Sequence, residues 1–175
     1  ILIGVFFIKF GFKNLHFYNK IRNIVTSKIS SLAAGEIEIK GTVLGNPEDT
    51  LTSPIKKAKC VSYNLKAYRW EKKEKGSGWD LIFHRTIQKP FYIYDKTGYI
   101  LIDPEGARVR NDTFHSVKSN RLLPEIQDII NKAYDSAGVP KLIRNLTKFI
   151  NLQSRYKFEE IFIPEGENIY VLGYT

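Results

Sequence analysis

Residues 51–104 read LTSPIKKAKCVSYNLKAYRWEKKEKGSGWDLIFHRTIQKPFYIYDKTGYILIDP, and this stretch decides the fold. Runs rich in aromatic and β-branched residues alternate in it with clusters of turn-forming residues, a pattern typical of antiparallel strands. The stretch also holds the only cysteine, Cys60, and both tryptophans, Trp70 and Trp79. It predicts four strands, which cover residues 60–70, 79–88, 91–94 and 99–102.

The first two of these strands are expected to form a hairpin. The segment 71–78 between them is charged and ends in Gly-Ser-Gly, which predicts a long mobile tip. Side chains alternate between the two faces of a strand. In strand 60–70 this alternation places Cys60, Ser62, Asn64, Lys66 and Tyr68 on one face, opposite Val61, Tyr63, Leu65 and Ala67.

A second, tighter hairpin is expected around residues 95–98, where Gly98 can supply the positive φ that a tight turn needs. Upstream, residues 36–44 alternate between apolar and polar side chains, which predicts a half-buried strand with a bulge at Gly41. The segment 18–34 predicts a basic connector with a short helical piece.

Downstream, apolar residues recur at helical spacing, and they predict one helix over 124–137 and a second over 140–152. Residues 157–163 and 169–174 then predict a closing hairpin around the turn at 164–167. The expected fold class is α+β, with a mostly antiparallel, curved sheet and two consecutive helices inserted before the closing hairpin.

The first eight residues, ILIGVFFI, are unbroken apolar sequence. A helix that spans a bilayer needs about 20 apolar residues, so two interpretations stay open. The run is either the tail of a transmembrane helix that begins upstream, or a buried strand or helix of a soluble fold. A cleaved signal peptide fits poorly, because its charges precede the apolar run, whereas here the basic residues follow it.

The charge distribution favours the membrane interpretation. The chain carries 27 basic and 18 acidic residues, a formal net charge of +9, and residues 1–30 contain no acidic residue. Basic residues beside a span are retained on the cytoplasmic side and attract anionic lipid head groups. The alternative is an ordinary solvated basic face. The juxtamembrane basic residues are Lys9, Lys13, Lys20, Arg22 and Lys28.

These residues give little evidence for a metal site or a catalytic site. A zinc module of the RING type needs four closely spaced Cys and His ligands, and this stretch has one cysteine. The three histidines, His16, His84 and His115, lie far apart in sequence. Cys60 is expected to be a small buried hydrophobe, since a reactive thiol needs an electropositive, partly exposed site with a base nearby. We therefore expect no metal and no cofactor.

Several polar residues have both a structural and a functional interpretation. Arg85 is expected to anchor loop carbonyls or Asp95, and the alternative is a guanidinium that faces a ligand. Asp80, Asp95 and Asp103 could form a metal or acid–base set. They stand at turn positions, however, where aspartate is favoured because it bonds to its own backbone.

The aromatic residues leave a nucleic-acid interpretation open. Trp70 and Trp79 are expected to meet across the hairpin as an aromatic pair, and the alternative is a platform on which a ligand stacks. Residues 56–75 are strongly basic and contain Tyr63, Tyr68 and Trp70. A basic antiparallel domain with aromatic residues is also typical of an oligonucleotide-binding barrel.

The order of short motifs in residues 51–104 resembles the GIDE-type domain, also called the beside-a-membrane domain. That order is Ser-Pro, Cys-Val-x-Tyr, Trp, a charged loop, Trp, Arg, Pro-Phe, Asp-x-x-Gly and Ile-Asp-Pro. In the family this domain lies next to transmembrane helices in membrane-bound E3 ubiquitin ligases and in bacterial and archaeal proteins. The positions that the resemblance marks as structural or partner-facing are Ser53, Pro54, Cys60, Tyr63, Trp70, Trp79, Arg85, Pro90, Phe91, Asp95, Gly98, Gly166 and Gly173.

The resemblance implies that residues 1–23 are the end of a transmembrane helix with a basic juxtamembrane segment, and that 24–175 form a GIDE-type domain truncated at its C-terminal end. It implies a membrane-anchored, non-catalytic domain on the cytoplasmic side that recruits a substrate for a C-terminal RING. The expected partners are the lipid bilayer and another protein, with nucleic acid as the alternative. The composition, with no Met and one Cys, suits a prokaryotic or archaeal source.

Overall fold

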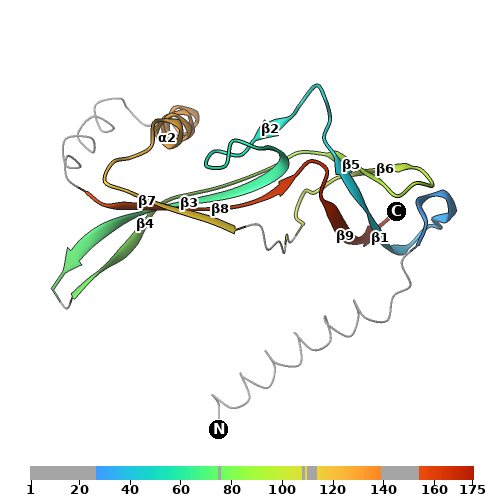
Figure 1. The fold of residues 1–175 in the computed structure, drawn as a ribbon, viewed down its shortest axis with the longest axis horizontal. Coiled ribbons are helices and arrows are strands. Elements are labelled where there is room, and N and C mark those ends of the chain that lie inside the picture. The colour runs from blue at the N-terminus through green and yellow to red at the C-terminus, as the bar shows by residue number, and fades with distance from the viewer. Residues whose placement is uncertain (1–26, 75, 108, 110–113, 139–153) are drawn as a thin grey trace, which may run out of the picture. The chain divides into compact units, whose positions relative to one another are not determined.

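The computed structural model describes residues 27–74, 76–107, 109, 114–138 and 154–175 (Figure 1). Their contacts divide them into two units, which are described separately. One unit holds the described residues up to Thr42 together with Ile93–Ile100 and Asn168–Thr175. The other unit holds Val43–Tyr92 and Leu101–Glu167.

Three predicted features lie outside the described residues. They are the apolar run 1–8, the second helix at 140–152, and the side chains of Lys9, Lys13, Lys20 and Arg22. Within the described ranges, no helix combines the length and the apolar character that a bilayer crossing requires. The same ranges contain one α-helix and mostly antiparallel strands, which confirms the antiparallel sheet of the predicted fold class.

The first unit is centred on a four-stranded sheet with the spatial order β6 (Tyr99–Ile102), β5 (Phe91–Tyr94), β1 (Glu36–Leu44) and β9 (Asn168–Tyr174). β1 and β9 pair antiparallel in continuous register through Gly41, so the pairing with β9 does not contain the bulge predicted there. A Cβ on Gly41 would lie 2.5 Å from Ile93 Cγ2 and 2.5 Å from the Tyr94 carbonyl oxygen. Glycine is required because β1 and β5 approach too closely for a side chain.

Asp95 organises the turn between β5 and β6. Its carboxylate accepts hydrogen bonds from the backbone N–H groups of Thr97 at 2.8 Å and Gly98 at 3.2 Å. It also accepts hydrogen bonds from the Thr97 hydroxyl at 2.6 Å and from the backbone N–H of Ile29 at 2.8 Å. Ile29 begins the short 3-10 helix η1 (Ile29–Ser31), so one side chain joins this segment to the hairpin.

The positive φ predicted for Gly98 belongs instead to Lys96, with φ at 72°. The turn tolerates a non-glycine residue there because the Asp95 carboxylate holds the following backbone N–H groups. Gly98 lies against Ile29, where an added Cβ would stand 3.3 Å from Cγ2. A glycine at this position therefore lets the turn lie close to Ile29.

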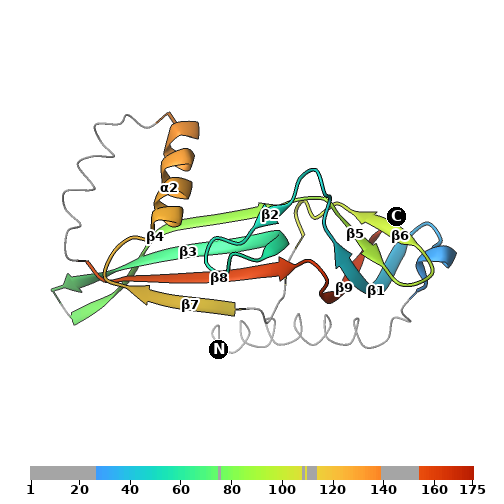
Figure 2. The ribbon, with the colours of Figure 1, turned by 45° about the horizontal axis from the view of Figure 1, so that its top comes forward.

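The second unit is built on a five-stranded sheet around β3 (Lys59–Lys73). This strand pairs antiparallel with β4 (Gly76–Gln88), with β8 (Tyr156–Pro164) and, near its start, with β2 (Leu51–Thr52). β7 (Phe114–Ser119) pairs antiparallel with β8. Figure 2 shows β4, β3, β8 and β7 side by side in a curled sheet, which confirms the predicted curved sheet, although the sequence did not predict β7.

The β3–β4 hairpin is longer than the sequence predicts. Residues 71–73 and 76–78 continue the two strands instead of forming a long loop, and pairing extends to Lys73 opposite Gly76. Gly76 has a φ of 122°, which glycine adopts readily and other residues avoid. Lys73 also forms an ion pair with Asp80 across the hairpin. The charged side chains that suggested a loop therefore support the strands.

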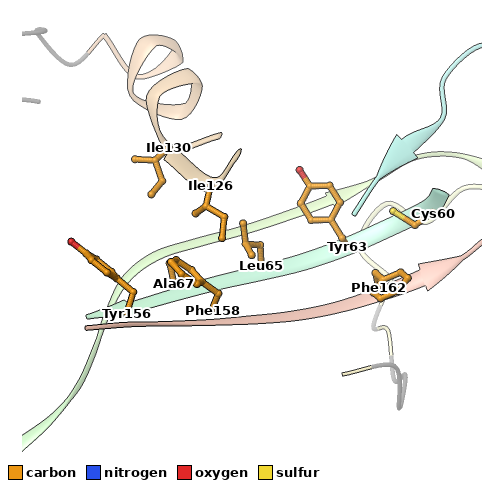
Figure 3. Packing of buried hydrophobic residues seen from close by; sticks show 9 residues of the cluster. All are labelled: Cys60, Tyr63, Leu65, Ala67, Ile126, Ile130, Tyr156, Phe158 and Phe162. Atoms are coloured by element: carbon orange, nitrogen blue, oxygen red, sulfur yellow. The ribbon is translucent and has the colours of Figure 1, made fainter. Parts of the chain in front are cut away.

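The helix α2 (Pro124–Ser136) covers one face of this sheet and confirms the first predicted helix. Its proline stands at the start, where the missing N–H is not needed, and Gly138 follows its end with a φ of 68°. Ile126 and Ile130 point from the helix toward the sheet (Figure 3). The core cluster consists of Cys60, Tyr63, Leu65, Ala67, Ile126, Ile130, Tyr156, Phe158 and Phe162.

Cys60 lies in this core, and the face predicted for it by alternation is wrong. The register of β3 on β8 shifts between Cys60 and Ser62, so a bulge interrupts the alternation at this point. The bulge brings Cys60 into the cluster of Tyr63 and Leu65, where it is fully buried.

The predicted closing hairpin is also wrong. Both strands form, but β8 pairs with β3 and β7, whereas β9 pairs with β1 in the other sheet. The intervening turn is fixed on β1, because the Gly166 N–H donates to the Val43 carbonyl and the Val43 N–H donates to the Glu167 carbonyl, both at 2.8 Å. The chain therefore continues along β1 instead of folding back on β8.

A buried carboxylate fixes the turn that precedes β3. Glu160 of β8 is fully buried, and its two oxygens accept the backbone N–H groups of Ile55 and Lys56, each at 3.1 Å. Ser53, also fully buried, closes the same turn by donating its N–H to the Ala58 carbonyl at 2.9 Å. A buried charge is costly unless it is hydrogen-bonded, and here the turn supplies both donors.

We expect Glu160→Ala to lower the free energy of unfolding by about 3 kcal/mol, because two backbone donors lose a charged acceptor and a void remains. Urea unfolding of the full chain measures this loss. Asp128→Asn, which alters an exposed carboxylate on α2, is the control and should stay within about 0.5 kcal/mol of wild type. Equal stability of wild type and Glu160→Ala would show that the turn does not need the carboxylate.

A second prediction concerns acid. Bonds from the Thr97 hydroxyl and from the N–H groups of Ile29, Thr97 and Gly98 hold the pKa of Asp95 below its ordinary value. Its contribution to stability is therefore complete above the unfolded pKa of about 3.9 and is lost as the pH falls through the lower folded value. Asp95→Asn should be less stable than wild type near neutrality, and the difference should shrink with acid in urea titrations. A difference independent of pH would contradict this.

Candidate functional site

The face of the five-stranded sheet opposite α2 carries polar, basic and aromatic side chains. Its members follow from the strand registers, because directly paired residues share a face and every second residue returns to it. We call it the open face. It comprises Ser62, Asn64, Lys66, Tyr68, Trp70 and Lys72 of β3, Trp79, Leu81, His84, Thr86 and Gln88 of β4, Phe114, Ser116 and Lys118 of β7, and Arg155, Lys157, Glu159 and Ile161 in and just before β8.

A cavity of about 260 Å³ lies on the part of the open face formed by the first half of β3 and the end of β4. Asn64 lies in its wall, and its side-chain nitrogen donates to the Thr86 hydroxyl at 2.8 Å and lies 3.0 Å from His84 Nε2. Hydroxyl, amide and ammonium groups suit a polar or acidic group, and the volume suits a side chain rather than a large cofactor. The polar lining is Ser62, Asn64, Lys66, Thr86 and Gln88, and the apolar lining is Ala107, Val109, Ile161 and Phe162.

A cluster of aromatic rings and cations lies further along the open face. The rings of Trp70 and Trp79 meet edge to face, with centroids 5.1 Å apart and planes at 72°, which confirms the predicted cross-strand pair. The Arg155 guanidinium lies 4.7 Å from the Trp70 ring centroid, and the Lys157 ammonium lies 4.4 Å from that of Tyr68. The cations are thus held on rings of the protein itself.

One carboxylate, that of Glu159, lies among these cations. Burial works against its ionised form, but hydrogen bonds from Lys157 and Tyr68 outweigh burial and lower its pKa. The Lys157 ammonium lies 2.8 Å from a Glu159 oxygen. Lys66, Lys72, Lys118, Arg155 and Lys157 give the open face five cations against this one carboxylate, so it is basic.

Cys60 has the environment of a structural thiol. Burial, followed by the charges of Glu160 and Glu165, raises its pKa to about 12. The thiol is therefore protonated at neutral pH, whereas a nucleophilic cysteine needs the thiolate. The prediction of a small buried hydrophobe is confirmed for its position in the core.

The three aspartates of the alternative metal or acid–base set serve separate purposes. Asp80 pairs with Lys73, Asp95 holds its turn, and Asp103 accepts the N–H of Glu105 at 3.0 Å. No group of three potential metal ligands occurs in the described part of the chain. Arg85 lies on β4 opposite Leu65, while the bonds to Asp95 come from other residues.

The remaining motif positions mostly build the scaffold instead of gathering in one site. Ser53, Pro54, Tyr63 and Phe91 are buried. Asp95, Gly98 and Gly166 stand in turns, while Gly173 lies opposite Ile37 in the first sheet. Pro90 links β4 to β5 with an exposed ring, and Lys28 is exposed just before η1. Of these positions, Trp70 and Trp79 reach the open face.

Sequence reasoning missed Glu160 and Lys157 and did not single out the polar lining of the cavity. Strand 60–70 did carry a signal, because its predicted polar face contained Ser62, Asn64 and Lys66. Lys157 and Glu160 could not be placed from the sequence, since their roles depend on pairing across about a hundred residues of chain, as for Tyr63 opposite Phe162.

Comparison with known proteins identifies the family of this chain. A family model described as GIDE, E3 ubiquitin ligase, matches residues 63–175, which is more than half of the chain. No curated protein and no solved structure matches the chain. The matched range includes α2, β9 and the open face apart from Ser62, and it begins after Ser53, Pro54 and Cys60.

We expect Cys60→Ala to cost about 1 kcal/mol of unfolding free energy through lost packing. A thiol probe near neutral pH should label native Cys60 far more slowly than it labels the same chain in denaturant, because the native thiol is buried and protonated. Cys60 is the only cysteine, so the label reports on one site. Native labelling as fast as that of the unfolded chain would reveal an activated thiolate.

Proposed function

Because the chain belongs to the GIDE family of E3 ubiquitin ligases, we propose that it is a membrane-anchored interaction domain that recruits a protein substrate for ubiquitin transfer elsewhere in the assembly. Its own residues bind a partner and take no covalent part in the transfer. The anchor places the domain on the cytoplasmic side of the membrane.

The open face carries this proposal. One face of the five-stranded sheet is occupied by α2 and the core cluster, which stabilises the scaffold. The opposite face presents a cavity lined by polar and apolar side chains, five cations and several aromatic rings. A rigid sheet with a polar, partly concave surface suits recognition of a partner. Covalent chemistry has less support, since the one thiol is buried and protonated at neutral pH.

The N-terminal sequence supports the anchor. Residues 1–8 are apolar, and residues 1–30 contain five basic and no acidic residues. Such a segment binds anionic head groups and is retained on the cytoplasmic side of a span. The described chain begins at Ser27 and enters β1 at Glu36, so the folded domain follows the basic segment closely.

Nucleic-acid binding is the second candidate, favoured by the cations and aromatic rings of the open face. Bases would stack on ring faces. Arg155 already covers one face of Trp70, Lys157 covers one face of Tyr68, and Trp79 meets Trp70. Stacking area is therefore reduced, and phosphate contacts alone would give binding that weakens steeply with salt. Protein recruitment is the better supported function.

Deletion of residues 1–20 should release the protein from membranes and leave its melting transition cooperative, because the described core uses residues from 37 onward. Flotation with lipid vesicles measures release, and circular dichroism measures melting. A matched variant, in which Lys9, Lys13 and Lys20 become Gln and the apolar run stays, should remain membrane-bound. Loss of the cooperative transition on deletion would make the segment part of the core and refute the anchor.

A further inference from the structure

We propose that the partner of the open face is an extended acidic polypeptide segment, which pairs with the free edge of β4 and places a carboxylate near Lys66 in the cavity. This inference rests on the proposed function and specifies the partner's chemistry. It joins two features of the same surface, an unpaired strand edge and an excess of positive charge.

The edge of β4 is long and open. β4 has 13 residues and pairs on one side with β3, and no other strand of the described chain pairs with it. Its outer edge therefore presents unpaired backbone N–H and carbonyl groups, which a further strand can satisfy. An extended polypeptide supplies the matching row of groups, whereas a lipid surface or a nucleic acid does not.

The usable part of this edge is residues 83–88. Toward the hairpin tip a register shift at Ala67/Tyr68 interrupts the pairing with β4, and an ion pair joins Lys73 to Asp80. Bulges and charges are the usual devices that block strand addition. Residues 83–88 pair in regular register, from Phe83 opposite Ala67 to Gln88 opposite Ser62. Strand addition is thus confined to the half of β4 that borders the cavity.

The cavity lies within reach of an added strand. A strand added to β4 lies about 4.8 Å from it, and β3 lies one further spacing away, so the backbone is about 10 Å from β3. A glutamate on the partner and Lys66 on β3 together span that separation. Every second side chain of the added strand faces the open face, beside His84, Thr86 and Gln88. Acidic residues at alternate positions therefore fit best.

The charge of the open face selects an acidic partner. Five cations face one carboxylate, and that carboxylate, Glu159, is already held by Lys157 at 2.8 Å. Lys66 lines the cavity beside the neutral Asn64 and Thr86 and lies opposite Glu159 of β8, so Lys66 and Lys157 together leave a net positive charge around that one carboxylate. The interleaved partner side chains face the other side of the sheet, where Phe83 and Ile87 of β4 are only partly buried beside the core and offer an apolar contact. The favoured segment alternates acidic and apolar residues.

The test uses the full chain in nanodiscs of neutral phosphatidylcholine. The probe is a capped peptide of about twelve residues that alternates Glu and Val and lacks aromatic residues. Both tryptophans of the chain, Trp70 and Trp79, lie on the open face, so their intrinsic fluorescence reports binding without a label. We expect a saturable change, and at least about tenfold weaker binding for the matched Lys–Val peptide.

Two further comparisons separate charge from strand pairing. Alternate N-methylation of the Glu–Val peptide keeps its charge but blocks pairing with an edge, and should abolish binding. Lys66→Glu should weaken binding at least about tenfold. Lys132→Glu changes the net charge equally on exposed α2 and should leave affinity unchanged. Cooperative melting of both variants confirms that they fold.

Each contrary result overturns the inference. These results are absence of binding, equal binding of the Lys–Val or N-methylated peptide, an equal effect of Lys132→Glu, and a fluorescence change that saturates with single-stranded RNA or anionic vesicles at lower concentration than with the Glu–Val peptide. A failure of the peptide-binding test can be distinguished from a failure of the membrane-anchor proposal. A chain that stays on membranes but ignores the peptide refutes this inference alone, and a chain that binds the peptide but lacks an anchor refutes the membrane proposal alone.

Discussion

The structure of the second unit depends on the buried Glu160 carboxylate. It lies on β8, beneath the turn that leads into β3, and receives the N–H groups of Ile55 and Lys56. An ionised group away from water needs such donors, and backbone donors in a turn need such an acceptor, so each satisfies the other. The same charge helps to keep Cys60 protonated. One side chain thereby fixes the turn before the central strand and adds to the effect of burial, which is the main cause of the raised pKa of Cys60.

The two faces of the five-stranded sheet have different roles because a strand presents alternate side chains to opposite sides. Leu65, Ala67 and Phe158 face α2 and form the core, while Asn64, Lys66 and Glu159 face away. The scaffold is stabilised on one side only. The other side is therefore free to carry a cavity and a charge excess at little cost in stability, which is the arrangement that a recognition surface requires.

The family motifs and the candidate binding surface occupy largely different residues. Ser53, Asp95 and Gly166 hold turns, and Tyr63 and Phe91 pack in buried positions. Such positions specify the fold, since a turn or a core site tolerates few residue types. The open face has no comparable constraint apart from its aromatic pair. A domain of this kind can keep one scaffold and change its partner by substitution on the open face, and the family match accordingly identifies the scaffold more than the ligand.

The sequence by itself determined most of the strands, the position of α2, and the meeting of Trp70 with Trp79, because alternation, helical spacing and hairpin proximity are local properties. It did not predict the short β2 or the strand β7. Tertiary structure alone decided that β9 pairs with β1, that a bulge turns Cys60 inward, and that the charged segment 71–78 continues a hairpin. It also decided that Glu160 is buried. Alternation predicts that a segment is a strand but not which strand it pairs with. A single inserted residue also moves every side chain on one side of it to the opposite face of the sheet. Pairing between segments far apart in the chain therefore decides the strand order and the side-chain faces, which local sequence does not determine.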